Sequence, residues 1–140
     1  MQRILIIFPL LLCFSACSSE NSQGRVAVRG NVTLDGKPIV EGSIQFESLP
    51  ESQPTVLVGG MIRQGAFSLP TEHGLLPDRE YTVRIRSLEE VPGSRIEAAD
   101  PMNSSVEYRD IIPPRYGSAS TLTVSATRKS PNVFQFSMSP

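Results

Sequence analysis

GNVTLDGKPIVEGSIQF occupies residues 30–46 and has the pattern of two strands joined by a tight turn. Apolar side chains stand at every second position on both sides of the turn: Val32, Leu34, Ile44 and Phe46. A period of two sends alternate side chains to opposite faces of a sheet, so each strand should have one dry and one wet face. Asp35 and Gly36 favour the positive φ angles of a tight turn. The stretch therefore predicts antiparallel β structure.

Three further residues have expected structural roles. Pro38 stiffens the crossover after the turn, because its ring fixes φ. Gly42 has no side chain and is expected to let the chain bend into the second strand. Tyr81 is expected at a corner of the fold, with its hydroxyl bonded to nearby backbone.

The same alternation recurs along the chain. Further apolar residues at alternate positions are Val26, Val28, Tyr81, Val83, Ile85, Leu122, Val124, Ala126, Phe134, Phe136 and Met138. The 10 glycines and 12 prolines fall mostly between these runs, and Gly59-Gly60 is among the expected breaks. Residues 25–140 are therefore predicted to form one all-β domain, a single antiparallel β-sandwich of about seven strands.

Residues 1–16 have the pattern of a secretory signal peptide. Arg3 gives a positive start, and an apolar run follows from Ile4 to Phe14. As a helix this run would span roughly 16 Å, about half of the ~30 Å hydrocarbon core, so a permanent span is excluded. An ordinary signal peptide with incidental cysteines is the alternative to a lipoprotein signal.

Residues 14–17, Phe-Ser-Ala-Cys, resemble the bacterial lipobox, in which an apolar residue and two small ones precede the modified cysteine. The resemblance implies that processing leaves Cys17 at the N-terminus with acyl chains attached. Cys13 is the rival, but Leu12 before it is too large for the small pocket of such peptidases. Two or more chains anchor a protein stably, so the first expected partner is a membrane, through this lipid anchor.

Residues 17–24 are the expected tether between anchor and domain. No apolar residue follows Cys17 in this segment, and a flexible chain of this length reaches roughly 15 Å. Ser18 stands where an aspartate favours inner-membrane retention in lipoproteins of well-studied bacteria, so the outer membrane is favoured. The expected location is the cell envelope, with the domain in the periplasm or at the cell surface.

Residues 30–46 resemble the opening of carboxypeptidase regulatory-like domains, relatives of the transthyretin-like sandwich. The matching residues are Gly30, Val32, Leu34, Asp35, Gly36, Pro38, Ile39, Gly42, Ile44 and Phe46. GAFSL at 65–69 and YTVRI at 81–85 extend the match, and residues 112–124 resemble small bacterial lipoproteins that carry this domain. The resemblance implies an immunoglobulin-like or transthyretin-like sandwich that serves as a non-catalytic folding, binding or spacer module.

Charge and reactive residues disfavour several functions. Thirteen Lys and Arg against 14 Asp and Glu, without a basic stripe, argue against a nucleic-acid partner. His73 is the only histidine, and Glu72 alone does not complete a metal or catalytic site, so we expect no cofactor and no enzyme activity. A carbohydrate-binding domain or a hydrolase of the cell envelope is the alternative. Beyond the membrane, the expected partner is an envelope protein or a glycan.

Four arginines form the candidate binding surface. Arg84 and Arg86 share the outward face of one expected strand, and Arg109 and Arg115 follow farther along. Together they would make an anion-binding patch. The alternative is a solvated face on which the arginines are paired with glutamates.

Residues 87–116 have weak periodicity and contain four prolines. Structureless loops longer than roughly 12–15 residues are uncommon in compact domains and are often functional, so this segment is a candidate recognition surface. An excursion that merely covers a sheet edge is the equal alternative. Ile111, Ile112 and Tyr116 are expected to dock its far end onto the domain.

Overall fold

The computed structural model describes residues 24–49, 54–98 and 101–140, which are all-β. Eight strands form the main sheet: β1 (Val28–Leu34), β2 (Lys37–Pro38), β3 (Glu41–Ser48), β4 (Leu57–Arg63), β5 (Ala66–Leu69), β6 (Arg79–Arg86), β9 (Thr123–Ala126) and β10 (Asn132–Met138). Two others, β7 (Leu88–Glu90) and β8 (Tyr108–Asp110), pair with each other. Single 3-10 turns are η1 (Thr71–His73), η2 (Pro101–Asn103) and η3 (Pro114–Tyr116).

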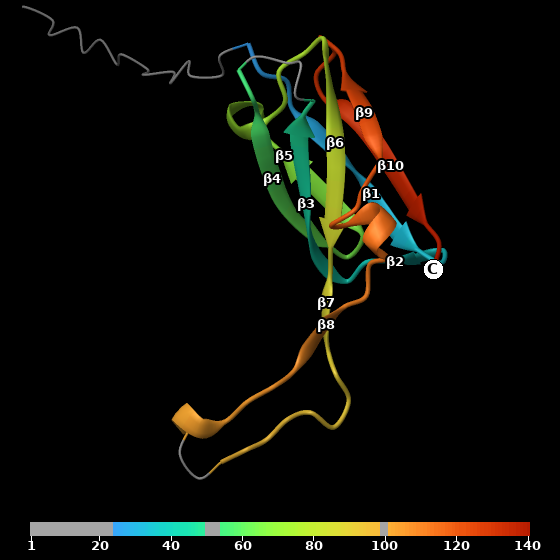
Figure 1. The fold of residues 1–140 in the computed structure, drawn as a ribbon. Coiled ribbons are helices and arrows are strands. Elements are labelled where there is room, and N and C mark those ends of the chain that lie inside the picture. Colours follow the sequence, from blue (N-terminus) through green and yellow to red (C-terminus); the bar gives the residue numbers. More distant parts are fainter. Residues whose placement is uncertain (1–23, 50–53, 99–100) are drawn as a thin grey trace, which may run out of the picture.

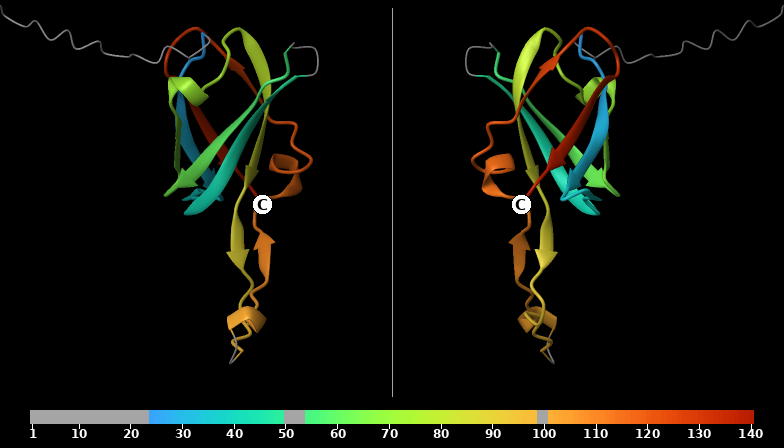
Figure 2. Two further views of the ribbon diagram at one scale, coloured as in Figure 1. Left: turned by 90° about the vertical axis from the view of Figure 1, so that its left-hand side faces the viewer. Right: turned by 90° about the vertical axis from the view of Figure 1, so that its right-hand side faces the viewer.

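The main sheet has the strand order β10-β1-β5-β4-β3-β6-β9, with β2 attached to β1. It curls so strongly that its two halves face each other (Figures 1 and 2). The prediction of an all-β sandwich is confirmed, and seven strands lie on the main path. One pair is not antiparallel: β1 and β10 run parallel, with Val28 opposite Asn132 and Leu34 opposite Met138. This pair arises where the chain crosses from β9 at one edge of the sheet to β10 at the other.

The core is made of the residues that share the inward parity of each strand. Fully buried side chains on the main strands include Val28, Val32, Ile44, Phe46, Ile62, Tyr81, Val83 and Ile85. Four phenylalanines, Phe46, Phe67, Phe134 and Phe136, link the two halves, with ring centroids 6.0 to 6.3 Å apart. Each buried side chain of this size contributes about 1.5–3 kcal/mol. Side chains of the opposite parity point outward.

The turn after β1 has the expected backbone conformation. Asp35 and Gly36 have φ angles of 51° and 73°, and the N–H of Asp35 donates to the carbonyl of Met138 at 2.8 Å. Gly42 has a different role from the one expected. It lies within β3, not at a bend, and a Cβ there would be 2.5 Å from the carbonyl oxygen of Arg86. Glycine is needed at this position because β6 approaches closely.

Gly59-Gly60 does not separate strands, contrary to expectation, because both glycines lie inside β4. A Cβ on Gly59 would be 2.7 Å from the carbonyl oxygen of Ile44, and one on Gly60 would be 2.8 Å from a methyl group of Leu69. These close approaches explain why a strand interior carries two residues of low β propensity. Because these two glycines have no side chains, the alternation of outward and inward residues in β4 cannot be recognised in the sequence.

Tyr81 forms the corner that the sequence predicts. Its ring is fully buried, and its hydroxyl accepts a hydrogen bond from the N–H of Leu76 at 2.9 Å and donates to the carbonyl of Leu76 at 3.1 Å. Burial raises the pKa of the Tyr81 phenol above its usual value. The hydroxyl therefore remains a neutral donor and fixes the loop before β6 against the core.

Candidate functional site

Residues 88–98 and 101–110 are the two sides of a hairpin that projects from one end of the sandwich, and we call residues 88–110 the arm (Figures 1 and 2). β7 and β8 pair from Leu88 opposite Asp110 outward. Farther out, Ile96 and Ser105 exchange two backbone hydrogen bonds of 2.9 and 3.0 Å. The expectation of a structureless segment is wrong here, and the arm extends away from the sandwich without covering a sheet edge. Its weak periodicity has a physical reason, since neither face of the hairpin packs into the core.

The root of the arm is held by backbone contacts to one carboxylate. Oδ1 of Asp110 accepts hydrogen bonds from the N–H groups of Ser87 at 3.2 Å and Ile112 at 3.0 Å. The hydroxyl of Ser87 donates to the carbonyl of Glu41 at 2.6 Å, which connects the root to β3. These bonds fix where both chains of the arm leave the sandwich.

The return of the chain to the sandwich follows the predicted docking. Ile112 is 5 % exposed and belongs to the core, and Ile111 and Tyr116 are partly buried against it. Segment 87–116 therefore has two parts. Its far end is structural, and the arm is the part that stands out into solvent.

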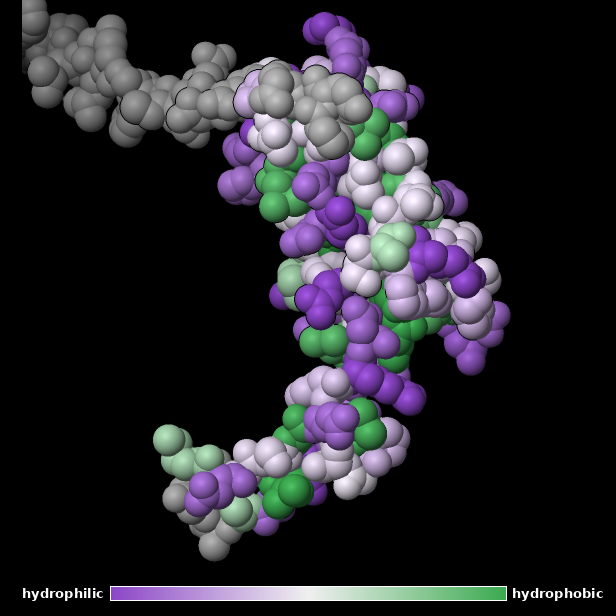
Figure 3. Space-filling model, in the orientation of Figure 1, coloured by the Kyte–Doolittle hydropathy of each residue, from purple (hydrophilic) through white to green (hydrophobic). Residues whose placement is uncertain are grey.

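The surface of the arm combines apolar and acidic side chains. Large apolar residues are exposed along it: Leu88, Ile96, Met102 and Tyr108, with exposed fractions of 54 % to 90 %. Figure 3 shows hydrophobic residues along the coloured part of the arm, interspersed with hydrophilic ones. Exposed apolar groups gathered on one projection mark an interaction site more often than scattered single ones do.

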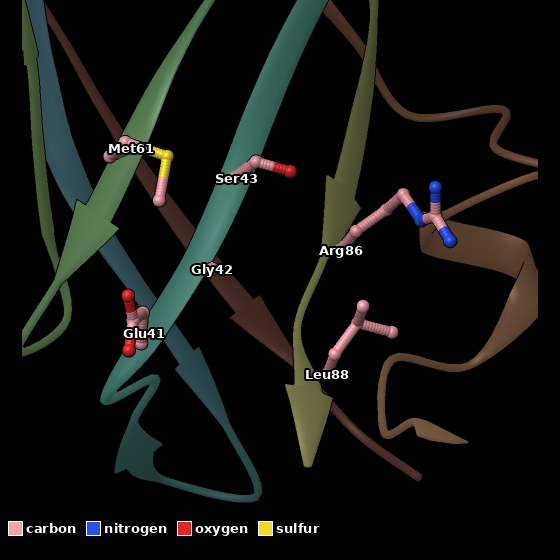
Figure 4. Close-up of a pocket in the computed structure, with 6 residues that line it drawn as sticks. All are labelled: Glu41, Gly42, Ser43, Met61, Arg86 and Leu88. Carbon is pink, nitrogen blue, oxygen red and sulfur yellow. The ribbon is translucent and has the colours of Figure 1, made fainter. Parts of the chain in front are cut away.

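A groove lies where the arm meets the outward face of the sheet. It has a volume of about 380 Å³ and is lined by Glu41, Gly42, Ser43, Met61, Arg86 and Leu88, as Figure 4 shows. A second groove of about 630 Å³ shares Glu41 and Leu88 and continues past Val40 and Ile111. The root of the arm thus presents the apolar side chains of Met61 and Leu88. Beside them lie the exposed guanidinium of Arg86 and the carboxylate of Glu41.

Arg84 and Arg86 lie on the outward face of β6, where each has an acidic neighbour. Arg84 forms an ion pair with Glu47 of β3, and Nε of Arg86 lies 3.4 Å from Oδ2 of Asp110. Both arginines line a depression of about 510 Å³ together with Asp110. Their charges are largely balanced, which matches the solvated, paired face more closely than an anion-binding patch.

The structure does not place Arg109 or Arg115 next to Arg84 and Arg86. Arg109 lies on the arm, opposite Glu89 in the register of β7 and β8. Arg115 is in η3, where its guanidinium donates to the carbonyls of Ser139 at 2.7 Å and Pro140 at 2.6 Å. The four arginines therefore have separate surroundings, and Arg115 holds the end of β10 in place.

Tyr116 lies beside Arg115, whose guanidinium carbon is 4.9 Å from the ring centroid. The Tyr116 hydroxyl is 3.5 Å from the hydroxyl of Ser139 and accepts a hydrogen bond from its N–H at 3.4 Å. Hydrogen bonds from Ser139, and then from Arg115, lower the pKa of Tyr116 to about 8. This phenol is therefore poised to ionise at mildly alkaline pH.

His73 is exposed in η1, and η1 lies at the end of the sandwich opposite the arm (Figure 1). It lines a shallow groove of about 250 Å³ with Arg25 and Glu72. Among the described residues, no group of three or more His, Cys, Asp or Glu side chains is arranged to hold a metal ion.

Cys17, the expected signal peptide at residues 1–16 and most of the expected tether at residues 17–24 lie outside the described residues, which begin at Gly24. Within the described ranges, no helix has the length and apolarity needed to cross a membrane.

Sequence reasoning missed the apolar residues at the root of the arm. Met61 and Leu88 are 52 % and 54 % exposed, and they line one groove because β4 and β6 both pair with β3 and Leu88 begins β7 just after β6. Only Leu88 had a sequence signal, since it continues the outward parity of Arg84 and Arg86, whereas Gly59 and Gly60 interrupt the alternation before Met61. An apolar residue at such a position indicates an outward apolar surface.

No protein-family model and no curated protein matches the chain. Among solved structures, the chain is similar to a 9R-lipoxygenase from Cyanothece PCC8801 at 12 % sequence identity, with a TM-score of 0.38. The match covers 87 % of this chain and 17 % of the lipoxygenase.

Proposed function

We propose that the chain is a lipid-anchored, non-catalytic binding module of the cell envelope, and that the arm is its binding element. Acyl chains on Cys17 hold the module at a membrane, with the outer membrane favoured. The polar residues up to Gly24 form the tether, and the β-sandwich carries the arm. The proposal also includes the kinship with carboxypeptidase regulatory-like domains that residues 30–46 indicate.

One observation carries the proposal: the arm leaves the sandwich at the end opposite the start of the described chain (Figures 1 and 2). Gly24 and Arg25 lie near the loop that holds Gly74, because Arg25 donates to the carbonyl of Gly74 at 2.8 Å. An anchor at Cys17 places that end next to the membrane. The arm is then the part of the module that reaches farthest from it.

The chemistry at the root of the arm favours binding over catalysis. Its charged groups, Arg86 and Asp110, hold each other and the backbone in place. The groove beside them combines two apolar side chains with groups that hydrogen-bond, which is typical of surfaces that recognise another molecule.

Site-specific photocrosslinking in intact cells tests this proposal. A photoreactive amino acid at Ile96, which is 61 % exposed on the arm, is expected to give a defined crosslinked species. The same amino acid at Val133, 54 % exposed on β10, is the matched control and should give none. Equal crosslinking at both positions, or crosslinking at Val133 alone, would move the binding surface to the sandwich.

A further inference from the structure

β7 has a neighbouring strand on one side only. It continues the line of β6 beyond the start of β3, as Figure 1 shows, and the pairing of β6 with β3 ends where Ser43 lies opposite Arg86. The carbonyl of Glu41, two residues earlier in β3, would be the next acceptor along this ladder. It instead accepts the hydroxyl of Ser87 at 2.6 Å, so β3 does not extend its pairing along the arm.

The backbone groups on the free edge of β7 follow from its bonds to β8. The N–H of Val91 donates to the carbonyl of Glu107 at 2.8 Å. Every second residue of an antiparallel strand bonds to a given neighbour, so Leu88 and Glu90 face away from β8. Their N–H and carbonyl groups have no hydrogen-bond partner among the described residues. Pro92, the next residue of the same parity, has no N–H and ends the edge.

The two grooves at the root of the arm both reach this edge, since Leu88 and Glu41 line each of them. The first groove includes Met61 and lies on the outward side of the sheet. The second includes Val40 and Glu89, and the side chain of Glu89 lies on the opposite face of β7 from that of Leu88. A strand in line with β3 would therefore have one groove beside each of its faces.

The charged side chains around the edge lie close to groups of opposite charge. Glu41 lies opposite Arg63 in the pairing of β3 with β4, and Glu89 lies opposite Arg109 in the pairing of β7 with β8. The edge therefore does not select a strongly charged ligand. Hydrogen bonds of the main chain and apolar contacts decide what binds there.

We infer that the free edge of β7 binds an extended segment of a partner protein, which adds a strand to the arm in line with β3. An extended polypeptide presents N–H and carbonyl groups about 6.8 Å apart on one side, the spacing that this edge requires. Residues opposite Leu88 and Glu90 would have their side chains on the outward face, beside Met61, and should be apolar. This inference rests on the proposed function, since it assigns a ligand class to the root of the same arm.

The edge is held in place before a ligand arrives. Asp110 accepts from the N–H of Ser87, and Ser87 bonds to Glu41, so little ordering of the root is left for the ligand to induce. The N–H and carbonyl groups of Leu88 and Glu90 can form up to four hydrogen bonds. A short peptide is therefore expected to bind with a Kd of about 0.1–1 mM.

Titration with a short peptide tests the inference. The probe is the capped peptide Lys-Thr-Val-Thr-Val-Thr-Lys, added to the isotope-labelled full chain in a mild detergent. In NMR spectra the amide protons of Leu88 and Glu90 are expected to shift downfield and to exchange more slowly, because each gains an acceptor.

Two methylated forms of the probe show whether a β ladder forms. N-methylation of both valines removes the N–H groups that would face β7 and should weaken binding at least about tenfold. N-methylation of two threonines is the matched control. Their N–H groups would face away from β7, so this peptide should keep the affinity of the parent.

Variants of the chain test the same bonds from the other side. Glu90→Pro removes one N–H of the edge and is compared with Glu90→Ala, because both lose the ion pair with Arg95. The proline variant should bind the probe about fivefold more weakly than the alanine variant. Val133→Pro, on the outer edge of β10, is the control and should bind the probe like the wild type.

No binding at about 1 mM probe, equal affinity of the two methylated peptides, or shifts confined to another strand edge such as β10 would overturn the inference. Slow exchange of Leu88 and Glu90 that appears without the probe and grows with protein concentration would also overturn it, because a second copy would then occupy the edge.

The two proposals fail separately. Absence of probe binding in a chain whose Ile96 position still crosslinks in cells keeps the arm as a binding element and removes strand addition. Probe binding at Leu88 and Glu90 by a chain that is never acylated in cells keeps strand addition and removes the lipid-anchored module.

Discussion

Asp110 accepts a hydrogen bond from the backbone N–H of Ser87, so a residue on the returning chain of the arm holds the outgoing chain at its root. The two residues are 23 positions apart in the sequence. The same Oδ1 atom also accepts from Ile112, and Ser87 bonds to Glu41 of β3. A single carboxylate thereby fixes the direction in which the arm leaves the sandwich.

Asp110→Ala is expected to loosen the arm without unfolding the sandwich. The substitution leaves two N–H groups without their acceptor, which should lower the free energy of unfolding by about 1–3 kcal/mol. Limited proteolysis should cut the variant first within residues 88–110. Asp110→Asn keeps an oxygen at this position and should behave like the wild type. Proteolysis that begins in the main sheet would contradict the proposed role.

Tyr81→Phe should lower the free energy of unfolding by about 1 kcal/mol, because the N–H and carbonyl of Leu76 lose the hydroxyl that satisfies both. Thermal unfolding followed by circular dichroism measures this loss. Tyr108→Phe, at an exposed position on the arm, is the matched control and should leave the melting temperature unchanged. Equal melting temperatures for Tyr81→Phe and the wild type would show that the corner bond contributes nothing.

Neighbouring residues of β10 should respond oppositely to the same substitution. Phe136 is 6 % exposed and contacts the phenylalanine cluster, so Phe136→Asp places an unpaired charge in the core and should unfold the domain. Gln135 points outward, and Gln135→Asp should change the free energy of unfolding by no more than about 0.5 kcal/mol. Soluble yield and chemical denaturation measure both. Similar damage from the two variants would argue against the assigned parity.

Tyr116 should titrate near pH 8, well below the usual value of 10.0 for tyrosine. Absorbance at 295 nm measures phenolate formation directly, and Tyr116→Phe should remove the low step while Tyr108→Phe retains it. Since the pKa is lower in the folded state, ionisation stabilises the fold. This contribution is complete above pH 10 and is lost as the pH falls through 8, so the free energy of unfolding should rise between pH 8 and 10. A titration near pH 10 would disprove the interaction with Ser139 and Arg115.

Metabolic labelling with a clickable palmitate tests the anchor. Cys17→Ala should abolish labelling and release the protein from the membrane fraction, because the acylated thiol is lost. Cys13→Ala is the control and should remain labelled, since the proposed processing removes the segment that contains Cys13. Labelling that survives Cys17→Ala but not Cys13→Ala would place the cleavage site at the other cysteine.

Much of the sandwich could be predicted from interactions between residues that are close together in the sequence. Val28, Val32, Phe46 and Val83 alternate with polar neighbours, and a period of two assigns a dry face to each strand wherever that strand lies. The turn at Asp35-Gly36 is equally local, since it depends on which residues tolerate positive φ.

Other features depend on residues far apart in the sequence. β4 could not be recognised in the sequence because its interior contains Gly59 and Gly60. Glycine is needed at these positions because Ile44 and Leu69 approach closely, and only the folded sheet brings these residues near them. The parallel pairing of β1 with β10 joins the two ends of the domain, and alternation carries no information about which strands become neighbours.

The candidate site also depends on residues that are far apart in the sequence. The all-β domain, its inward residues and its tight turn could be predicted from the sequence, because they follow from interactions between near neighbours in the chain. The folded sheet is needed to see that the arm projects, that Met61, Arg86 and Leu88 line one groove at its root, and that the four arginines are separated. Strand pairing joins distant segments, so the position of a side chain on the surface depends on the whole sheet and not on its own neighbours.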